Sequence, residues 1–171
     1  TAFCSYDGST LDKKTPLLRS MEVLNKQSCR LLKLFGKDVK KVTSTVGAEQ
    51  EYFLIDKNLY QKRKDLIFCN RTLFGAKPPK GQELEDHYYG AIKPRIVNFM
   101  KDLDEQLWKL GIPSKTKHNE VAPCQHEMAP VFTTTKLAAD QNQLTMEIMK
   151  KVAQEHDMIC ILHEKPFDGL N

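Results

Sequence analysis

The sequence predicts one compact domain that combines α-helices with β-strands, and three observations support this. At 171 residues, the chain is long enough to bury roughly 70% of its unfolded surface. Its composition, 40% hydrophobic and 28% charged, suits a globular domain. Apolar residues recur at helical spacing in three segments, and two shorter runs are rich in the β-branched and aromatic residues that strands favour.

The first predicted helix begins at Thr15 and ends before Gly36. A hydroxyl side chain followed by Pro16 is typical of a helix start, because proline lacks an N–H group that the first turn would leave unpaired. Leucine, methionine and phenylalanine then recur at helical spacing until the glycine. We expect this helix to serve mainly as scaffold.

The segment from Glu49 to Ile55 is predicted to form a strand, since its apolar residues alternate with polar ones. Side chains repeat every two residues along a strand, so Glu49 and Glu51 share one face while Gln50 points to the other. Buried carboxylates are too costly to leave unpaired, and a divalent cation is a common partner. The alternative is a chance pattern whose acids are solvated or paired with lysine or arginine.

A polar, irregular segment runs from Lys57 to Glu85, with proline and glycine as breaking residues. A loop of this length inside a domain is typically a lid, an interface arm or a binding loop. Asp86 is then expected to cap a second helix from Tyr88 to Leu110. Pro94 fits that helix only near its first turn or at a kink.

Glu120 and Glu127 belong to the central stretch, residues 118–130. Their separation of seven positions would place them on opposite faces of one unbroken strand. Pro123 argues against both such a strand and a helix. We therefore predict a bend or bulge at residues 122–124 that returns both carboxylates to one side.

The third predicted helix covers Lys136 to Asp157, with threonines 133–135 as its cap. A continuous apolar run, Met158 to Leu162, is then typical of a buried strand. It leads into the last segment, residues 163–171.

The carboxylates of Glu49, Glu51, Glu120 and Glu127 together suit one or two Mg²⁺ or Mn²⁺ ions, which prefer hard oxygen ligands. Two such ions can bridge phosphate oxygens and neutralise charge that develops in phosphoryl transfer. A rival interpretation is a zinc site, and its ligands would be His118, Cys124 and His126. None of the usual zinc spacings is met, which counts against it.

Composition argues against several other classes of protein. The net charge of +4 is mild, and the basic clusters lack the interleaved aromatics of a nucleic-acid binder. No apolar run approaches the roughly 18 residues of a membrane span, and no secretory segment is present. Five cysteines without a CxxC pair fit a reducing, cytoplasmic compartment. We expect the chain to be a piece of a longer protein.

Three successive motifs resemble those of the glutamine synthetase catalytic domain: GAEQEYF at 47–53, NEVAPCQHE at 119–127, and KPF at 165–167 with Gly169 and Asn171. Two further segments look like signatures of the type III branch: RTLFGAKPPKGQELEDHY at 71–88 and LDKKTPLLRS at 11–20. The resemblance covers nearly the whole chain. It implies an α+β fold with a mainly antiparallel, curved sheet and flanking helices.

The resemblance also implies ligands for two metal ions. Glu51, Glu120 and Glu127 would hold one Mg²⁺ or Mn²⁺, and Glu49 would help to hold the second, on which the phosphates of ATP sit.

Two further residues would bind substrates, and no catalytic residue is assigned within this stretch. His118 matches a histidine beside the nucleotide, and Asn171 matches an asparagine that touches the substrate glutamate. The position of Asn119 is often histidine in other branches, and Asp168 replaces a small residue.

The implied reaction is ATP-dependent ligation of ammonia to L-glutamate through a γ-glutamyl phosphate intermediate. The implied assembly is a ring-based homo-oligomer, a dodecamer by family resemblance, with neither nucleic acid nor membrane as a partner. Residues 1–171 would be the front half of the catalytic domain, truncated before a Gly-Ser-Gly-x-His motif and inactive alone. The alternative is a divalent-metal or nucleotide-binding module without catalysis, and a zinc hydrolase is the third and least favoured interpretation.

Overall fold

The computed structural model describes residues 2–170, which divide into two compact units where the sequence predicted one domain. The first unit takes the chain up to Gly47 together with Phe132–Asp140. The second takes Ala48–Val131 and the chain from Gln141 onward. Among the described residues, no helix combines the length and the apolar character needed to cross a membrane.

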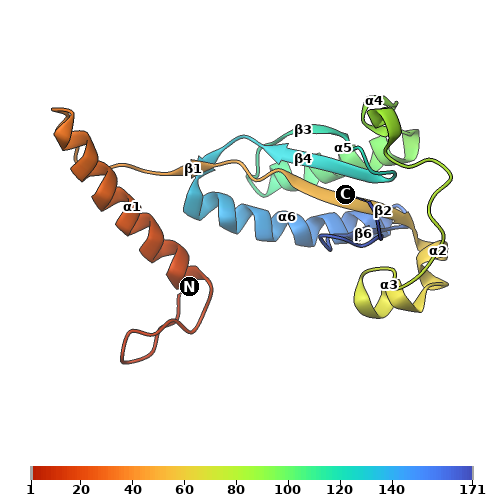
Figure 1. Cartoon of the computed structure of the whole chain (residues 1–171), viewed down its shortest axis with the longest axis horizontal. Coiled ribbons are helices and arrows are strands. Elements are labelled where there is room, and N and C mark those ends of the chain that lie inside the picture. The colour runs from red at the N-terminus through yellow and green to blue at the C-terminus, as the bar shows by residue number, and fades with distance from the viewer. Residues whose placement is uncertain (1, 171) are drawn as a thin grey trace. The chain divides into compact units, whose positions relative to one another are not determined.

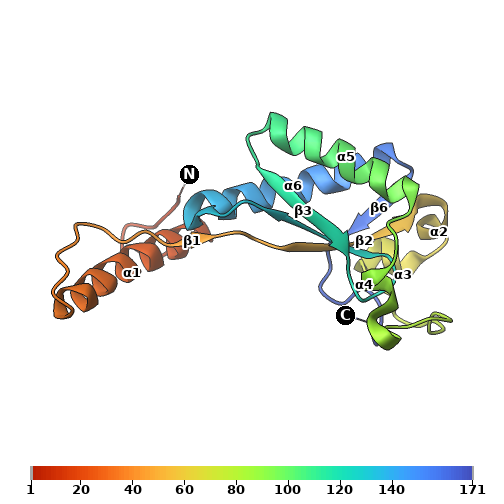
Figure 2. The same cartoon turned by 90° about the horizontal axis from the view of Figure 1, so that it is seen from above.

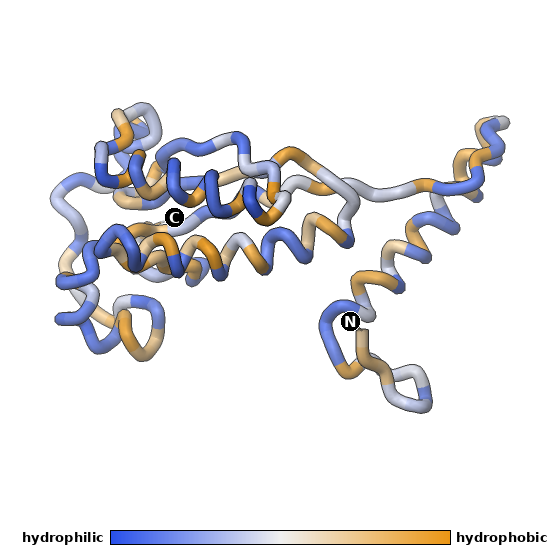
Figure 3. Tube along the Cα trace, turned by 180° about the vertical axis from the view of Figure 1, so that it is seen from behind, coloured by the Kyte–Doolittle hydropathy of each residue, from blue (hydrophilic) through white to orange (hydrophobic). Residues whose placement is uncertain are grey.

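The first unit is built on helix α1 (Lys14–Leu34) and a short antiparallel pairing of β1 (Thr45–Val46) with β5 (Thr133–Thr134). Hydrophobic and hydrophilic residues alternate around α1 (Figure 3), and several of its apolar side chains stay exposed. The start differs from the prediction, because the carboxylate of Asp12 accepts from the N–H of Thr15 at 3.0 Å. The Thr15 hydroxyl itself donates to a backbone carbonyl, that of Phe3.

The second unit contains a four-stranded sheet in which every neighbouring pair is antiparallel. Its strand order is β3 (Ser114–Asn119), β4 (Gln125–Pro130), β2 (Gln50–Asp56) and β6 (Met158–Ile161). The predicted α+β class, with a mainly antiparallel sheet and flanking helices, is confirmed.

Helices α5 (Pro94–Lys109) and α6 (Thr135–Glu155) run along one side of this sheet (Figures 1 and 2). Their apolar stripes meet alternate residues of the strands in the larger hydrophobic core. Its buried members include Tyr52, Phe99, Leu103, Leu107, Met128, Met149, Val152 and Met158. The helix predicted over 88–110 is thus shorter, since Pro94 occupies its first turn and a separate short helix, α4 (Asp86–Tyr89), precedes it.

The opposite face of the sheet carries a smaller core. Phe53, Leu66, Ala122 and Ile161 form it, and Phe167 packs edge-on against Phe53 with 5.1 Å between ring centroids. The segment predicted to be irregular contributes α2 (Lys57–Gln61), α3 (Lys64–Cys69) and the 3-10 turn Glu83–Glu85. These elements are too short for hydrophobic periodicity to reveal.

The bend predicted at residues 122–124 is a full chain reversal. The N–H of Glu120 donates to the carbonyl of Gln125 at 2.9 Å, and the N–H of Gln125 donates to the carbonyl of Ala122 at 3.2 Å. Cys124 adopts a left-handed backbone with φ 61°. A hairpin between β3 and β4, and not a bulge within one strand, therefore brings the two halves of the central stretch side by side.

The buried helical face makes Leu103→Ala a test of the larger core. Leu103 is 1% exposed whereas Leu110, at the end of the same helix, is 49% exposed. We expect Leu103→Ala to lower the free energy of unfolding by about 2–5 kcal/mol through lost burial and a residual cavity. Leu110→Ala, measured in parallel by urea unfolding, should cost less than about 1 kcal/mol. Equal losses would show that this face of α5 is not packed as described.

His126 should make stability fall as the pH is lowered. Burial of its imidazole lowers its pKa from 6.5 to about 4, so between these values the unfolded chain binds a proton that the folded protein does not. This contribution is complete above pH 6.5 and is lost on acidification, on the order of 3 kcal/mol by pH 4. Unfolding free energies measured at pH 7.5, 5.5 and 4.5 should fall less steeply in His126→Gln than in wild type.

Candidate metal centre

The pairing of three strands sets Glu51, Glu127 and His118 in one row across the sheet. Glu51 of β2 lies directly opposite Glu127 of β4, and Glu127 lies directly opposite His118 of β3. Directly paired residues of antiparallel strands project their side chains from the same face. This face is the one that carries Phe53, because residues alternate along β2.

Glu120 joins the row from the end of β3. Single ligand atoms of His118, Glu120 and Glu127 all lie within 4.8 Å of one another. The imidazole Nε2 of His118 is 3.2 Å from Glu127 Oε1, and its Nδ1 is 3.6 Å from Glu120 Oε1. Both carboxylates are largely buried, with side-chain exposures of 15% for Glu120 and 12% for Glu127. The hairpin thus achieves the convergence of these two acids that the sequence predicted.

The cluster concentrates negative charge in a partly desolvated place. Burial raises the pKa of Glu120, and the nearby charge of Glu127 raises it further. The pKa of His118 is raised by the hydrogen bond of its ring to the Asn119 carbonyl, with the charges of Glu127 and Glu120 acting in the same direction. A positive charge between the three side chains is therefore favoured.

The donor set suits a hard divalent cation. Nδ1 of His118 lies 2.8 Å from the carbonyl oxygen of Asn119, which can only accept, so Nδ1 carries the proton. In the neutral ring Nε2 is then left as a lone pair directed at Glu127. A lone pair that faces carboxylate oxygens requires a cation or a second proton. The contact of Nδ1 with a backbone carbonyl is, moreover, a usual way in which proteins orient a metal-ligating histidine.

The other two predicted carboxylates lie outside this group. The Glu51 carboxylate accepts from Nε2 of Gln125 at 2.9 Å, which holds it beside Glu127 in the row. Like charges directly opposite each other destabilise a strand pair, so Glu51 and Glu127 also favour a bound cation. Glu49 precedes β2, is exposed, and does not belong to the group. The structure therefore brings two of the four acids together and sets a third beside them.

The zinc ligands considered from the sequence are not brought together among residues 2–170. His126 is next to Glu127 on β4 and so faces the opposite side of the sheet. Its Nδ1 contacts Oδ1 of Asn119 at 2.9 Å. Cys124 is exposed in the hairpin turn. Asn171, expected to touch a substrate, lies outside the described residues.

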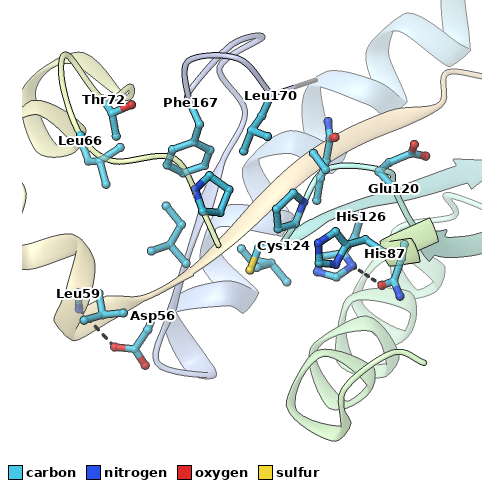
Figure 4. Close-up of a pocket in the computed structure, with 18 of the residues that line it drawn as sticks. Asp56, Leu59, Leu66, Thr72, His87, Glu120, Cys124, His126, Phe167 and Leu170 are labelled. Atoms are coloured by element: carbon cyan, nitrogen blue, oxygen red, sulfur yellow. Dashed lines mark hydrogen bonds between the residues drawn. The ribbon is translucent and has the colours of Figure 1, made fainter. Parts of the chain in front are cut away.

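A cavity of about 1000 Å³ lies next to the hairpin. Figure 4 shows Phe167 and Leu170 of the C-terminal segment on one side of it, with His87, Glu120 and His126 on another. Five lysine and arginine residues also line it: Arg63, Arg71, Lys77, Lys93 and Arg95. Of these, Arg63 pairs with Asp65 and Arg95 with Asp56. The N–H and hydroxyl of Thr72 both donate to the carbonyl of Pro166, at 2.7 and 3.2 Å. Two motifs far apart in the sequence therefore meet at this cavity.

Two residues at the site were not found by sequence reasoning. Gln125 could have been recognised, because it shares a strand face with Glu127 two positions away. Tyr88, whose ring centroid is 5.2 Å from that of His118, gave no local signal, since its contact spans thirty positions of chain.

Residues 27–171 match the family model described as the catalytic domain of glutamine synthetase. A glutamine synthetase from Butyrivibrio fibrisolvens is 62% identical over the whole of this chain, and a type-3 glutamine synthetase from Dictyostelium discoideum is 52% identical. The second match agrees with the type III signatures in the sequence. The chain spans about a quarter of the length of these relatives, 24% and 23%.

Solved structures give the same fold at much lower identity. One, described as apo GmaS without ligand, has 21% identity and a TM-score of 0.55, and the match covers 74% of this chain and 27% of that chain. Another, described as a novel glutamine synthase homolog, has 17% identity and a TM-score of 0.52 over 93% of this chain and 30% of the other. From the family match across most of its length, we conclude that the chain belongs to the glutamine synthetase family and carries part of its catalytic domain.

Proposed function

We propose that the full-length protein containing this chain is a glutamine synthetase, an ATP-dependent ligase that joins ammonia to L-glutamate. The observation that carries the proposal is the row of Glu51, Glu127 and His118, with Glu120 beside it, in a chain of this family. The reaction would proceed through γ-glutamyl phosphate, and its substrates would be glutamate, ammonia and ATP.

Glu51, Glu120 and Glu127 would hold one divalent ion, and Glu49 would take part in a second site. A bound Mg²⁺ or Mn²⁺ would neutralise charge that develops on phosphate oxygens during phosphoryl transfer. Gln125 orients Glu51 through its amide, and Nε2 of His118 faces Glu127 Oε1 at 3.2 Å. His118 would in addition lie next to the nucleotide, and Asn171 would contact glutamate.

The arrangement of residues supports this chemistry because phosphoryl transfer depends mainly on positioning and charge neutralisation. Glu51 and Glu127 project from paired strands and Glu120 directly follows β3, and side chains on such a scaffold keep their geometry better than acids on loops would. The family further suggests a ring-based homo-oligomer, for which a dodecamer is our proposal, in the cytoplasm.

Glu127→Gln tests the ligase and the metal role together. The substitution keeps the shape of the side chain and removes its charge, so we expect Mn²⁺ affinity to fall at least tenfold. The rate of ATP-dependent glutamine formation by the full-length protein should fall at least a hundredfold. The matched control is Glu147→Gln on the exposed side of α6, where Glu147 is 73% exposed and pairs only with Lys150 among the described ion pairs. Wild-type protein that is folded yet makes no glutamine would refute the proposal.

Glu49 and Glu51 should differ in which ion they affect. Glu51 lies in the carboxylate row and Glu49 lies outside it. We therefore expect Glu51→Gln to weaken the tighter Mn²⁺ site, and Glu49→Gln to weaken only the second. Calorimetric titration of each variant, with ATP present and absent, measures both sites. Loss of the tighter site in Glu49→Gln would contradict this division of roles.

A further inference from the structure

The short segment from Asp86 to Gly90 contacts the edge strand β3 on both of its faces. His118 and Asn119 are consecutive residues of β3, so their side chains project from opposite faces of the sheet. On the face of the carboxylates, the ring of Tyr88 lies 5.2 Å from the His118 ring at an angle of 60°. On the other face, Nδ2 of Asn119 donates to the carbonyl of Gly90 at 3.0 Å.

The Asn119 amide is fixed at its other end by a buried histidine. Because Nδ2 faces a carbonyl, Oδ1 must be the atom that faces His126 Nδ1, 2.9 Å away. His126 is 6% exposed and packs beside Tyr52, with 5.9 Å between ring centroids. The Asn119 amide therefore links the Gly90 carbonyl, at the end of α4, to His126 on the core face of β4.

His118 needs such a constraint more than its carboxylate partners do. Its side chain is 30% exposed, about twice the exposure of Glu120 or Glu127. Its two ring nitrogens contact a carbonyl and a carboxylate, and both contacts depend on the rotation of the ring. An aromatic ring packed on the imidazole limits that rotation, and ring pairs at this separation stabilise each other beyond the area they bury.

We propose that Tyr88 and Asn119 are positioning residues of the metal centre, which clasp the edge of β3 and hold the His118 ring in the orientation that presents Nε2 to Glu127. Asn119 holds the α4 segment in place from the core face, and Tyr88 restrains the imidazole from the carboxylate face. This assignment rests on the proposed function, because it gives the two residues a role toward the same divalent ion.

Mn²⁺ binding to the full-length protein, measured by calorimetry in the absence of nucleotide, tests the clasp without relying on activity. Tyr88→Ala should weaken Mn²⁺ affinity on the order of three- to tenfold. Tyr88→Phe keeps the ring and should bind within about twofold of wild type. Tyr89→Ala is the matched control, because Tyr89 is the next residue of α4, is 77% exposed, and contacts the ring of Tyr88 but has no described contact with His118.

Asn119→Ala tests the other arm of the clasp. It should weaken Mn²⁺ affinity in the same direction, and Tyr88→Ala added to it should cost little more, because two residues of one unit are not additive. This variant also leaves the buried Nδ1 of His126 without its partner, so its melting temperature should fall. If it does not fold, the Tyr88 series decides alone.

A second readout separates positioning from general damage. The Mn²⁺ concentration that gives half-maximal glutamine formation should rise in Tyr88→Ala, whereas kcat at saturating Mn²⁺ should stay within about twofold. Equal Mn²⁺ affinity in Tyr88→Ala and Tyr89→Ala would overturn the clasp while leaving the metal centre intact. Wild-type affinity in Glu127→Gln would instead overturn the metal centre and the clasp with it.

Discussion

The register between β2, β4 and β3 is the constraint on which the site depends. It sets Glu51, Glu127 and His118 abreast on one face, and the same register buries Tyr52 and Met128 on the other. A slip of one residue would move every side chain of a strand to the opposite face. The apolar core beneath α5 and α6 therefore fixes the positions of the carboxylates, although no carboxylate residue belongs to this core. Like charges held opposite each other destabilise the strand pair, and burial of the core offsets this cost.

The sequence predicted those helices, strands and shared strand faces that depend on neighbouring residues alone. The three long helices and strand β2 follow from apolar periodicity, and β6 follows from a continuous apolar run. The shared face of Glu49 and Glu51 follows from alternation. Pro123 correctly indicated that Glu120 and Glu127 do not belong to one straight strand. The sequence predicted a bend or bulge at this point, and the structure has a hairpin. The hairpin was missed because its turn lacks the Asn-Gly or Asp-Gly pair that is typical of one. In this turn Cys124 adopts a positive φ, and cysteine is not one of the residue types that commonly do so.

The features that sequence could not supply all depend on contacts between distant segments. Tyr88 lies against His118 only because α4 ends before Pro94 and crosses the end of β3. The short helices α2 and α3 form where Tyr60 of α2 and Leu66 of α3 pack in the smaller core with Phe53, and this tertiary packing outweighs the weak helix propensity of a few residues. The division into two units likewise reflects how few apolar residues of α1 find partners within the described chain, which periodicity alone does not reveal.

With the proposed metal site, the crowded carboxylates would also link the stability of the folded protein to the concentration of divalent ions. A ligand that binds only the folded state raises the free energy of unfolding by RT ln(1 + [L]/Kd), about 2.7 kcal/mol when the free ion is at a hundred times Kd. The repulsion within the row is greatest in the ion-free protein, so the sheet that carries it would be least secure when divalent cations are scarce. The supply of magnesium or manganese would then set how long the protein stays folded, and chelation would lower its free energy of unfolding.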